Sequence, residues 1–139
     1  MPEGLPGRSG GTYLFFLVAA DASSLPFAAF LMPRRHADLR DLTPQEAGRQ
    51  GELLAAIEAA ATASLPIPRI QVARWGDGGE HLHRWLYARP TGMLQLRGTF
   101  LSHWDDLLPP RPVDEVAADA ALWSAALSAR VGGVHRPDR

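Results

Sequence analysis

Hydrophobic and polar residues recur with different periods along the chain, and each period predicts a type of element. Two apolar runs rich in aromatic and branched residues, at 12–20 and 27–32, flank the turn-forming stretch 22–26 and are typical of a β-hairpin. Farther along, apolar residues recur at three- and four-residue spacing, as on one face of an amphipathic helix: Leu53, Leu54, Ile57, Ala60 and Ala61. Strands and helices in this order predict an α+β fold.

Local signals place both ends of this helix. Thr43 is suited to the N-cap position, Pro44 fits the first helical position, and Glu46 completes a capping-box pattern. Pro66 cannot continue a helix, because its ring removes a backbone donor and blocks the preceding turn. We therefore expect a helix that begins at Pro44 and runs to about Ser64.

The chain after this helix has the pattern of a second hairpin. Residues 70–75 form a short strand-like segment, 76–79 form a Gly-Asp-Gly-Gly turn, and 80–89 return as a longer alternating strand. The two segments should pair antiparallel because so short a turn leaves no room for a crossover. Together the hairpins predict an antiparallel sheet carrying one main helix.

The C-terminal third predicts one further strand and a second helix. Residues 93–101 are expected to form the strand, and the proline-rich stretch 107–112 an extended linker. Asp114 is expected to cap a final helix that ends at Gly132, with an apolar stripe of Val116, Ala120, Trp123, Ala126 and Leu127. The expected organisation is a flexible N-terminal tail (1–11), one domain (12–131) and a C-terminal tail (132–139).

Composition narrows the chemistry. A chain of 139 residues that is 46% hydrophobic can build one domain with a core. All 14 cationic side chains are arginine, which excludes Schiff-base and P-loop lysines, and the lack of cysteine excludes thiolate nucleophiles and disulfides. A net charge of −1 argues against general nucleic-acid or anionic-membrane binding. We expect a cytoplasmic protein without membrane spans; the alternative is that the apolar run 12–20 belongs to a secretion signal.

The strand predicted at 80–89 carries the candidate chemistry. Its alternation places five functional side chains on one face: His81, His83, Trp85, Tyr87 and Arg89. Imidazole serves as a base, nucleophile or metal ligand near neutral pH, and guanidinium matches the oxygens of phosphate with a forked set of donors. This combination indicates phosphate-ester chemistry.

Several motifs occur in an order that resembles the histidine triad superfamily. A strand ends in Pro33-x-x-His36, a helix opens with Leu-Thr-x-x-Glu at 42–46, and a glycine-rich turn leads to a His-x-His strand that ends in arginine. The resemblance covers about residues 26–90. Members of that superfamily carry a third histidine where this chain has Trp85. The resemblance implies a histidine-triad-like α+β fold and a homodimer.

The same resemblance implies roles for particular residues. His83 matches the nucleophile that attacks the α-phosphorus of a nucleotide and forms a nucleotidyl-histidine intermediate, so the implied activity is that of a nucleotide hydrolase or nucleotidyl transferase. Other positions match those surrounding the substrate: His36, His81, Arg89, Trp85 and the backbone amides of Gly78 and Gly79. No cofactor and no metal are implied.

Alternatives remain at the level of sequence. Trp85 cannot titrate as the missing histidine would, so the substrate should carry a good leaving group, or the protein is a catalytically impaired nucleotide- or phosphate-binding module. Three imidazoles, those of His36, His81 and His83, are also a possible zinc-ligand set. Finally, the polar segment 103–106 can reach the site from a loop or simply be solvated.

Overall fold

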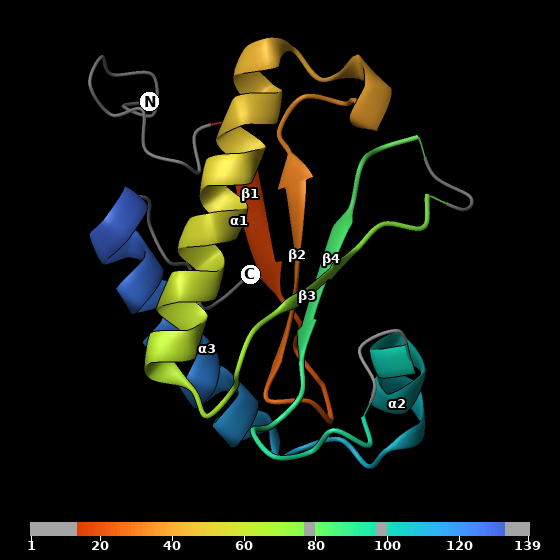
Figure 1. Ribbon diagram of the computed structural model, residues 1–139, viewed down its shortest axis with the longest axis vertical. Helices are drawn as coiled ribbons and strands as arrows, with labels where there is room; N and C mark the ends of the chain where they lie inside the picture. The colour runs from red at the N-terminus through yellow and green to blue at the C-terminus, as the bar shows by residue number, and fades with distance from the viewer. Residues whose placement is uncertain (1–13, 77–79, 97–99, 133–139) are drawn as a thin grey trace.

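The described part of the chain folds into a four-stranded antiparallel sheet and three α-helices (Figure 1). The computed structural model describes residues 14–76, 80–96 and 100–132. The sheet has the order β1-β2-β4-β3. Its elements are β1 (Phe15–Ala19), β2 (Phe27–Pro33), η2 (Leu39–Asp41, a 3₁₀ turn), α1 (Pro44–Ser64), β3 (Gln71–Ala73), β4 (Arg84–Ala88), α2 (Leu101–Leu107) and α3 (Val113–Val131). The general α+β class predicted from the sequence is thus confirmed.

Strand β2 lies in the interior of the sheet, and its side chains point alternately to the two faces. It pairs antiparallel with β1 in the predicted hairpin and with β4 on its other side, and β3 pairs antiparallel with β4. Alternate residues of β2, namely Phe27, Ala29 and Leu31, are buried on the face covered by α1 and α3. The intervening residues lie on the opposite face, as the period of two in a strand requires.

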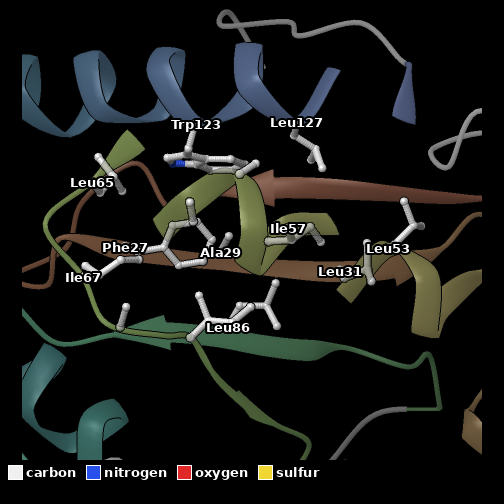
Figure 2. Packing of buried hydrophobic residues seen from close by; sticks show 14 of the residues in the cluster. Phe27, Ala29, Leu31, Leu53, Ile57, Leu65, Ile67, Leu86, Trp123 and Leu127 are labelled. Atoms are coloured by element: carbon white, nitrogen blue, oxygen red, sulfur yellow. The ribbon is translucent and has the colours of Figure 1, made fainter. Parts of the chain in front are cut away.

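The larger hydrophobic core fills the space between the sheet and these two helices. Figure 2 shows side chains of β2, β4, α1 and α3 converging there, including Leu86, Ile57 and Leu127. The rings of Phe27 and Trp123 lie with their centroids 5.0 Å apart at a tilted angle. This packing explains the predicted apolar stripes of both long helices, because each stripe faces the sheet.

Both ends of α1 lie where the sequence predicts them. The backbone N–H of Glu46 donates to the Thr43 hydroxyl over 3.1 Å, and the Glu46 carboxylate accepts from the Thr43 backbone N–H over 2.9 Å. This reciprocal capping box satisfies two of the donors that a helix leaves unpaired at its start. The last helical residue is Ser64. The prediction from capping chemistry is therefore confirmed.

A smaller hydrophobic cluster forms on the opposite face of the sheet, beneath α2. It contains buried Leu25, Tyr87, Leu96 and Leu101, with Trp85 and Trp104 among the partly buried residues packed against it. In Figure 1, α2 lies beside the end of β4, away from α1 and α3. The sheet therefore has helical cover on both faces, but α2 covers only part of the second one.

Three local predictions are wrong. Residues 93–96 form a turn and Leu101 begins a helix, so the described part of the strand predicted at 93–101 does not form. The strand predicted at 80–89 is limited to Arg84–Ala88. Asp114 lies inside the first turn of α3, whose N-cap is Pro112 without a side-chain cap hydrogen bond.

The physical reason for the first error is the spacing of Leu101, Trp104 and Leu108. All three face the smaller cluster, and intervals of three and four residues place them on one side of a helix.

Within the described ranges, no helix is long and apolar enough to cross a membrane.

Candidate functional site

A pocket of about 390 Å³ lies on the sheet face opposite α1. Four parts of the chain contribute to it: the N-cap residue of η2, the segment 74–76 that follows β3, the segment that leads into and through β4, and α2. The lining residues are Asp38, Arg74, Trp75, Gly76, His81, Leu82, His83, Trp85, Tyr87, Ser102 and His103. Four of the five side chains predicted on one face of the 80–89 segment thus meet in one pocket.

Aromatic rings follow one another along this face. The centroids of His81 and His83 are 5.9 Å apart, those of His83 and Trp85 6.4 Å, and those of Trp85 and Tyr87 6.2 Å in a stacked arrangement. His36 continues the row beyond His81, with a centroid separation of 5.3 Å, although His36 itself is exposed and does not line the pocket. The predicted alternation is therefore present even though the two histidines precede β4.

One of the three pocket histidines, His81, is held in a defined tautomer. The Nε2 atom of His81 lies 2.8 Å from the backbone oxygen of Pro33. Because a carbonyl oxygen only accepts, Nε2 must carry the proton, and in the neutral ring Nδ1 is then the free acceptor. His83 is exposed, and no hydrogen bond to its ring comes from the described residues; its neighbours are the rings of Phe30, His81 and Trp85.

The guanidinium that lines the pocket belongs to Arg74, a residue that the sequence analysis did not select. Its Nη2 lies 2.7 Å from Oδ1 of Asp38, and this hydrogen bond is the main reason that the pKa of Asp38 is lowered. A Cβ on Gly76 would lie 3.3 Å from the Arg74 guanidinium carbon, and the positive φ of 72° at Gly76 also favours glycine. The turn therefore leaves room for this cation.

Arg89, predicted to contact phosphate, has a different environment. Its Nη1 donates to the backbone oxygen of Leu96 over 3.0 Å, and it is not among the described residues that line the pocket. The backbone of Gly78 and Gly79, predicted to contribute amides, lies outside the described residues. A role of these three residues toward phosphate remains a prediction.

Arg84 points to the other side of β4, as the alternation requires. Its Nε donates over 2.6 Å to the side-chain oxygen of Gln50, a buried residue of α1. Burial is the main cause of its lowered pKa, and the nearby charge of Arg74 contributes. The partner of the Arg84 guanidinium under the sheet is thus a neutral amide.

Two more aromatic or titratable groups enter the pocket from outside β4. Trp75 is half exposed, and its ring centroid lies 6.2 Å from that of Trp85. His103 is exposed on α2, with its ring centroid 6.2 Å from that of Phe100. The segment 103–106 is thus part of a helix, and its first residue reaches the pocket.

Hydrogen bonds fix α2 relative to the sheet. Oδ1 of Asp105 accepts from the Ser23 hydroxyl over 2.6 Å and from the Ser24 backbone N–H over 2.9 Å, both in the turn between β1 and β2. Packing of Leu101 and Trp104 in the smaller cluster adds apolar contact. The position of His103 is consequently determined by the fold.

Tyr87 has mainly a structural environment. It is buried in the smaller cluster, and burial together with the charges of Asp105 and Asp106 raises its pKa to about 12. Its phenol is therefore neutral at physiological pH.

No three histidine, aspartate or glutamate side chains among the residues with assigned positions are arranged to hold a metal ion, so the zinc alternative has no support there.

Comparisons of the chain with models of protein families, with curated proteins and with solved structures found no match.

Proposed function

We propose that the protein is a nucleotide hydrolase or nucleotidyl transferase that acts at an α-phosphate through a nucleotidyl-histidine intermediate on His83. The observation that carries this proposal is the meeting of His81, His83 and the Arg74 guanidinium in one pocket. A nitrogen nucleophile and a fixed cation are the two elements that phosphoryl-group transfer needs most. The ordered motifs that resemble the histidine triad superfamily support the same reaction.

In the first step, a ring nitrogen of His83 attacks the α-phosphorus. A nitrogen–phosphorus bond forms while the phosphorus–oxygen bond to the leaving group breaks, and the electron pair of that bond stays with the leaving oxygen. Arg74 stabilises the negative charge on the phosphate oxygens. His36, Arg89 and the Gly78–Gly79 amides are the further phosphate contacts implied by the resemblance.

In the second step, water or another hydroxyl acceptor attacks the same phosphorus and releases His83. Water yields a nucleoside monophosphate, and a different acceptor yields a transferred nucleotide. The aromatic walls of the pocket, formed by Trp75 and Trp85, suit a planar base because rings stack favourably on one another. The substrate class is accordingly a nucleotide ester, and a homodimer is the assembly we expect.

Intact-mass spectrometry tests the nucleophile. Wild-type protein, His83→Ala and His81→Ala are mixed briefly with a nucleoside 5′-monophosphate ester that has an aryl leaving group. We expect one added nucleotidyl group on wild type and on His81→Ala, located at His83 by peptide mapping, and none on His83→Ala. The His81 variant is a necessary comparison because His81 is the alternative nucleophile. Its Nε2–H is held by the Pro33 carbonyl oxygen, which leaves Nδ1 free to attack.

An adduct located at His81, or unchanged turnover by folded His83→Ala, would contradict the assignment of the nucleophile. Circular dichroism of each variant establishes that the comparison is between folded proteins. Because the side chain of His83 is exposed, its truncation removes little packing, and we expect the fold to be retained.

A second candidate function is a nucleotide- or phosphate-binding module without turnover. The specific observation in its favour is Trp85, whose ring lies within the pocket at the position where the superfamily has its third histidine. Calorimetric titration with nucleoside monophosphates distinguishes the two. Binding heat without product or adduct favours the module, whereas no binding heat and no competition with a nucleotide probe removes it.

A further inference from the structure

Nucleophilic attack by His83 sets a geometric requirement on any group that assists the leaving oxygen. In phosphoryl transfer, the attacking atom and the leaving atom are roughly in line on opposite sides of phosphorus. A group that donates a proton to the leaving oxygen must therefore reach the side of phosphorus away from His83. Trp85 does not meet the chemical requirement, because its indole N–H does not titrate in the useful range.

The remaining titratable groups in the pocket can be compared one by one. Asp38 is engaged with Arg74, and its pKa is lowered. The guanidinium itself stays protonated, and Tyr87 has its pKa raised to about 12. Nε2–H of His81 donates to the Pro33 carbonyl oxygen, so only Nδ1 of that ring is available to a ligand. The first three groups do not donate a proton near neutral pH, and His81 presents a single ring nitrogen in a direction set by its bond to Pro33.

His103 differs from all of them in position and in bonding. It enters the pocket from α2, whereas His81 and His83 come from the segment leading into β4. No hydrogen bond to its ring comes from the residues that the structure describes, and its ring neighbour there is Phe100. An exposed imidazole can exchange protons with solvent and still reach a bound ligand.

The helix that carries His103 is anchored at two points. Asp105 bonds to the turn between β1 and β2, and Leu101 is buried in the smaller cluster. A functional group on an element anchored in this way keeps a defined position relative to the other residues of the pocket, which proton transfer requires. The anchored helix α2 thus positions His103 in the pocket in addition to covering part of the sheet.

We propose that His103 is a catalytic residue that donates the proton to the leaving oxygen, in the place of the histidine that Trp85 replaces. This inference rests on the proposed function. As the phosphorus–oxygen bond breaks and its electron pair moves to oxygen, the imidazolium of His103 supplies the proton and becomes neutral. In the second step, neutral His103 accepts a proton from the attacking water, so that both His83 and His103 return to their starting states.

A series of leaving groups tests this assignment. Nucleoside 5′-monophosphate esters of phenols and alcohols with increasing leaving-group basicity are mixed with an excess of wild type, His103→Ala or His103→Gln, and the single-turnover rate of leaving-group release measures the first step alone. In both variants this rate should fall about a hundredfold to ten-thousandfold with alkoxide leaving groups, and less than about threefold with nitrophenolate, which needs no proton. Glutamine retains a polar side chain that cannot donate a proton by titration, so the two variants should behave alike.

Ser102→Ala is the matched control, because Ser102 lines the same pocket from the neighbouring position of α2. It should reduce turnover equally, and by little, across the series. The exposed position of His103 makes it unlike a core residue, and hydrogen exchange of α2 amides verifies that the helix is retained in each variant.

The results separate this inference from the function on which it rests. A steeper dependence on leaving-group basicity in both His103 variants supports proton donation. An equal loss across the series, or no loss, overturns the inference while the nucleotidyl adduct on His83 preserves the proposed function. Absence of turnover and of adduct in wild type with every ester overturns both.

Discussion

The ion pair at the start of α1 makes a quantitative prediction about stability. Glu46 is only 5% exposed, and its carboxylate lies 2.7 Å from Nη2 of Arg35. It also accepts from the backbone N–H of Thr43. The hydrogen bond from Arg35, followed by the one from Thr43, lowers the pKa of Glu46 from the ordinary 4.5 to about 2.

The sign and size of the effect follow from linkage between protonation and folding. Because the carboxyl pKa is lower in the folded state, Glu46 stabilises the fold above about pH 4.5, and this contribution is lost as the pH falls toward about 2. At about 1.4 kcal/mol per pKa unit, a shift from 4.5 to about 2 sets an upper limit of about 3.5 kcal/mol. The Arg35 side chain is 49% exposed, and solvent screening therefore reduces the expected contribution to roughly 1–2 kcal/mol.

Urea unfolding of wild type and Glu46→Gln at a series of pH values measures this contribution. Glutamine keeps the size and can still accept from Thr43, but it removes the charge. The variant should be less stable by roughly 1–2 kcal/mol at pH 7, and the difference should disappear near pH 2. Glu52→Gln, at an exposed ion pair with Arg49, should change stability by less than about 0.5 kcal/mol. A difference for Glu46→Gln that does not vary with pH would refute the reasoning.

Two further predictions concern the core and the pocket. Phe27→Ala should destabilise the fold by about 3–5 kcal/mol, because Phe27 is 1% exposed and packs against Trp123. Urea unfolding measures this loss. The control variant Phe100→Ala, at a residue that is 54% exposed, should cost less than about 1 kcal/mol. In the His103→Ala background, Trp85→His should raise hydrolysis of esters with alkoxide leaving groups by about tenfold or more, because it adds a titratable ring beside His83. Steady-state rates test the second prediction, and unchanged rates in a folded variant would count against it.

Elements whose signals are local were predictable from the sequence. Thr43, Pro44 and Glu46 specify the start of α1 through contacts within one helical turn, and both the start and the end of that helix are confirmed. Helix α2 was missed because its apolar residues find their partners far away in the chain. Leu101 packs in a cluster with Leu25, and Asp105 bonds to Ser23, contacts that no short sequence window contains.

The same distinction holds for the candidate site. Alternation correctly placed His81, His83 and Trp85 along one side of a single segment, because strand periodicity is a local property. Arg74 and His103 enter the pocket from other elements. The sequence indicated that the segment 103–106 can reach the site, although from a loop rather than from a helix. Arg74 was missed, and the signal for it was its position directly before Trp75, at the end of a predicted strand and the start of a glycine-rich turn.

The alternation within β4 has a consequence for how this protein can change during evolution. Leu86 belongs to the main core, and Trp85 on the other face belongs to the pocket. A shift of pairing by one residue would exchange these faces, exposing the leucine and burying the tryptophan against α1. Substitutions at Trp85 can therefore alter ligand preference with little effect on the core, whereas insertions or deletions are tolerable in the β3–β4 connection only when the loop absorbs them and the strand register is kept.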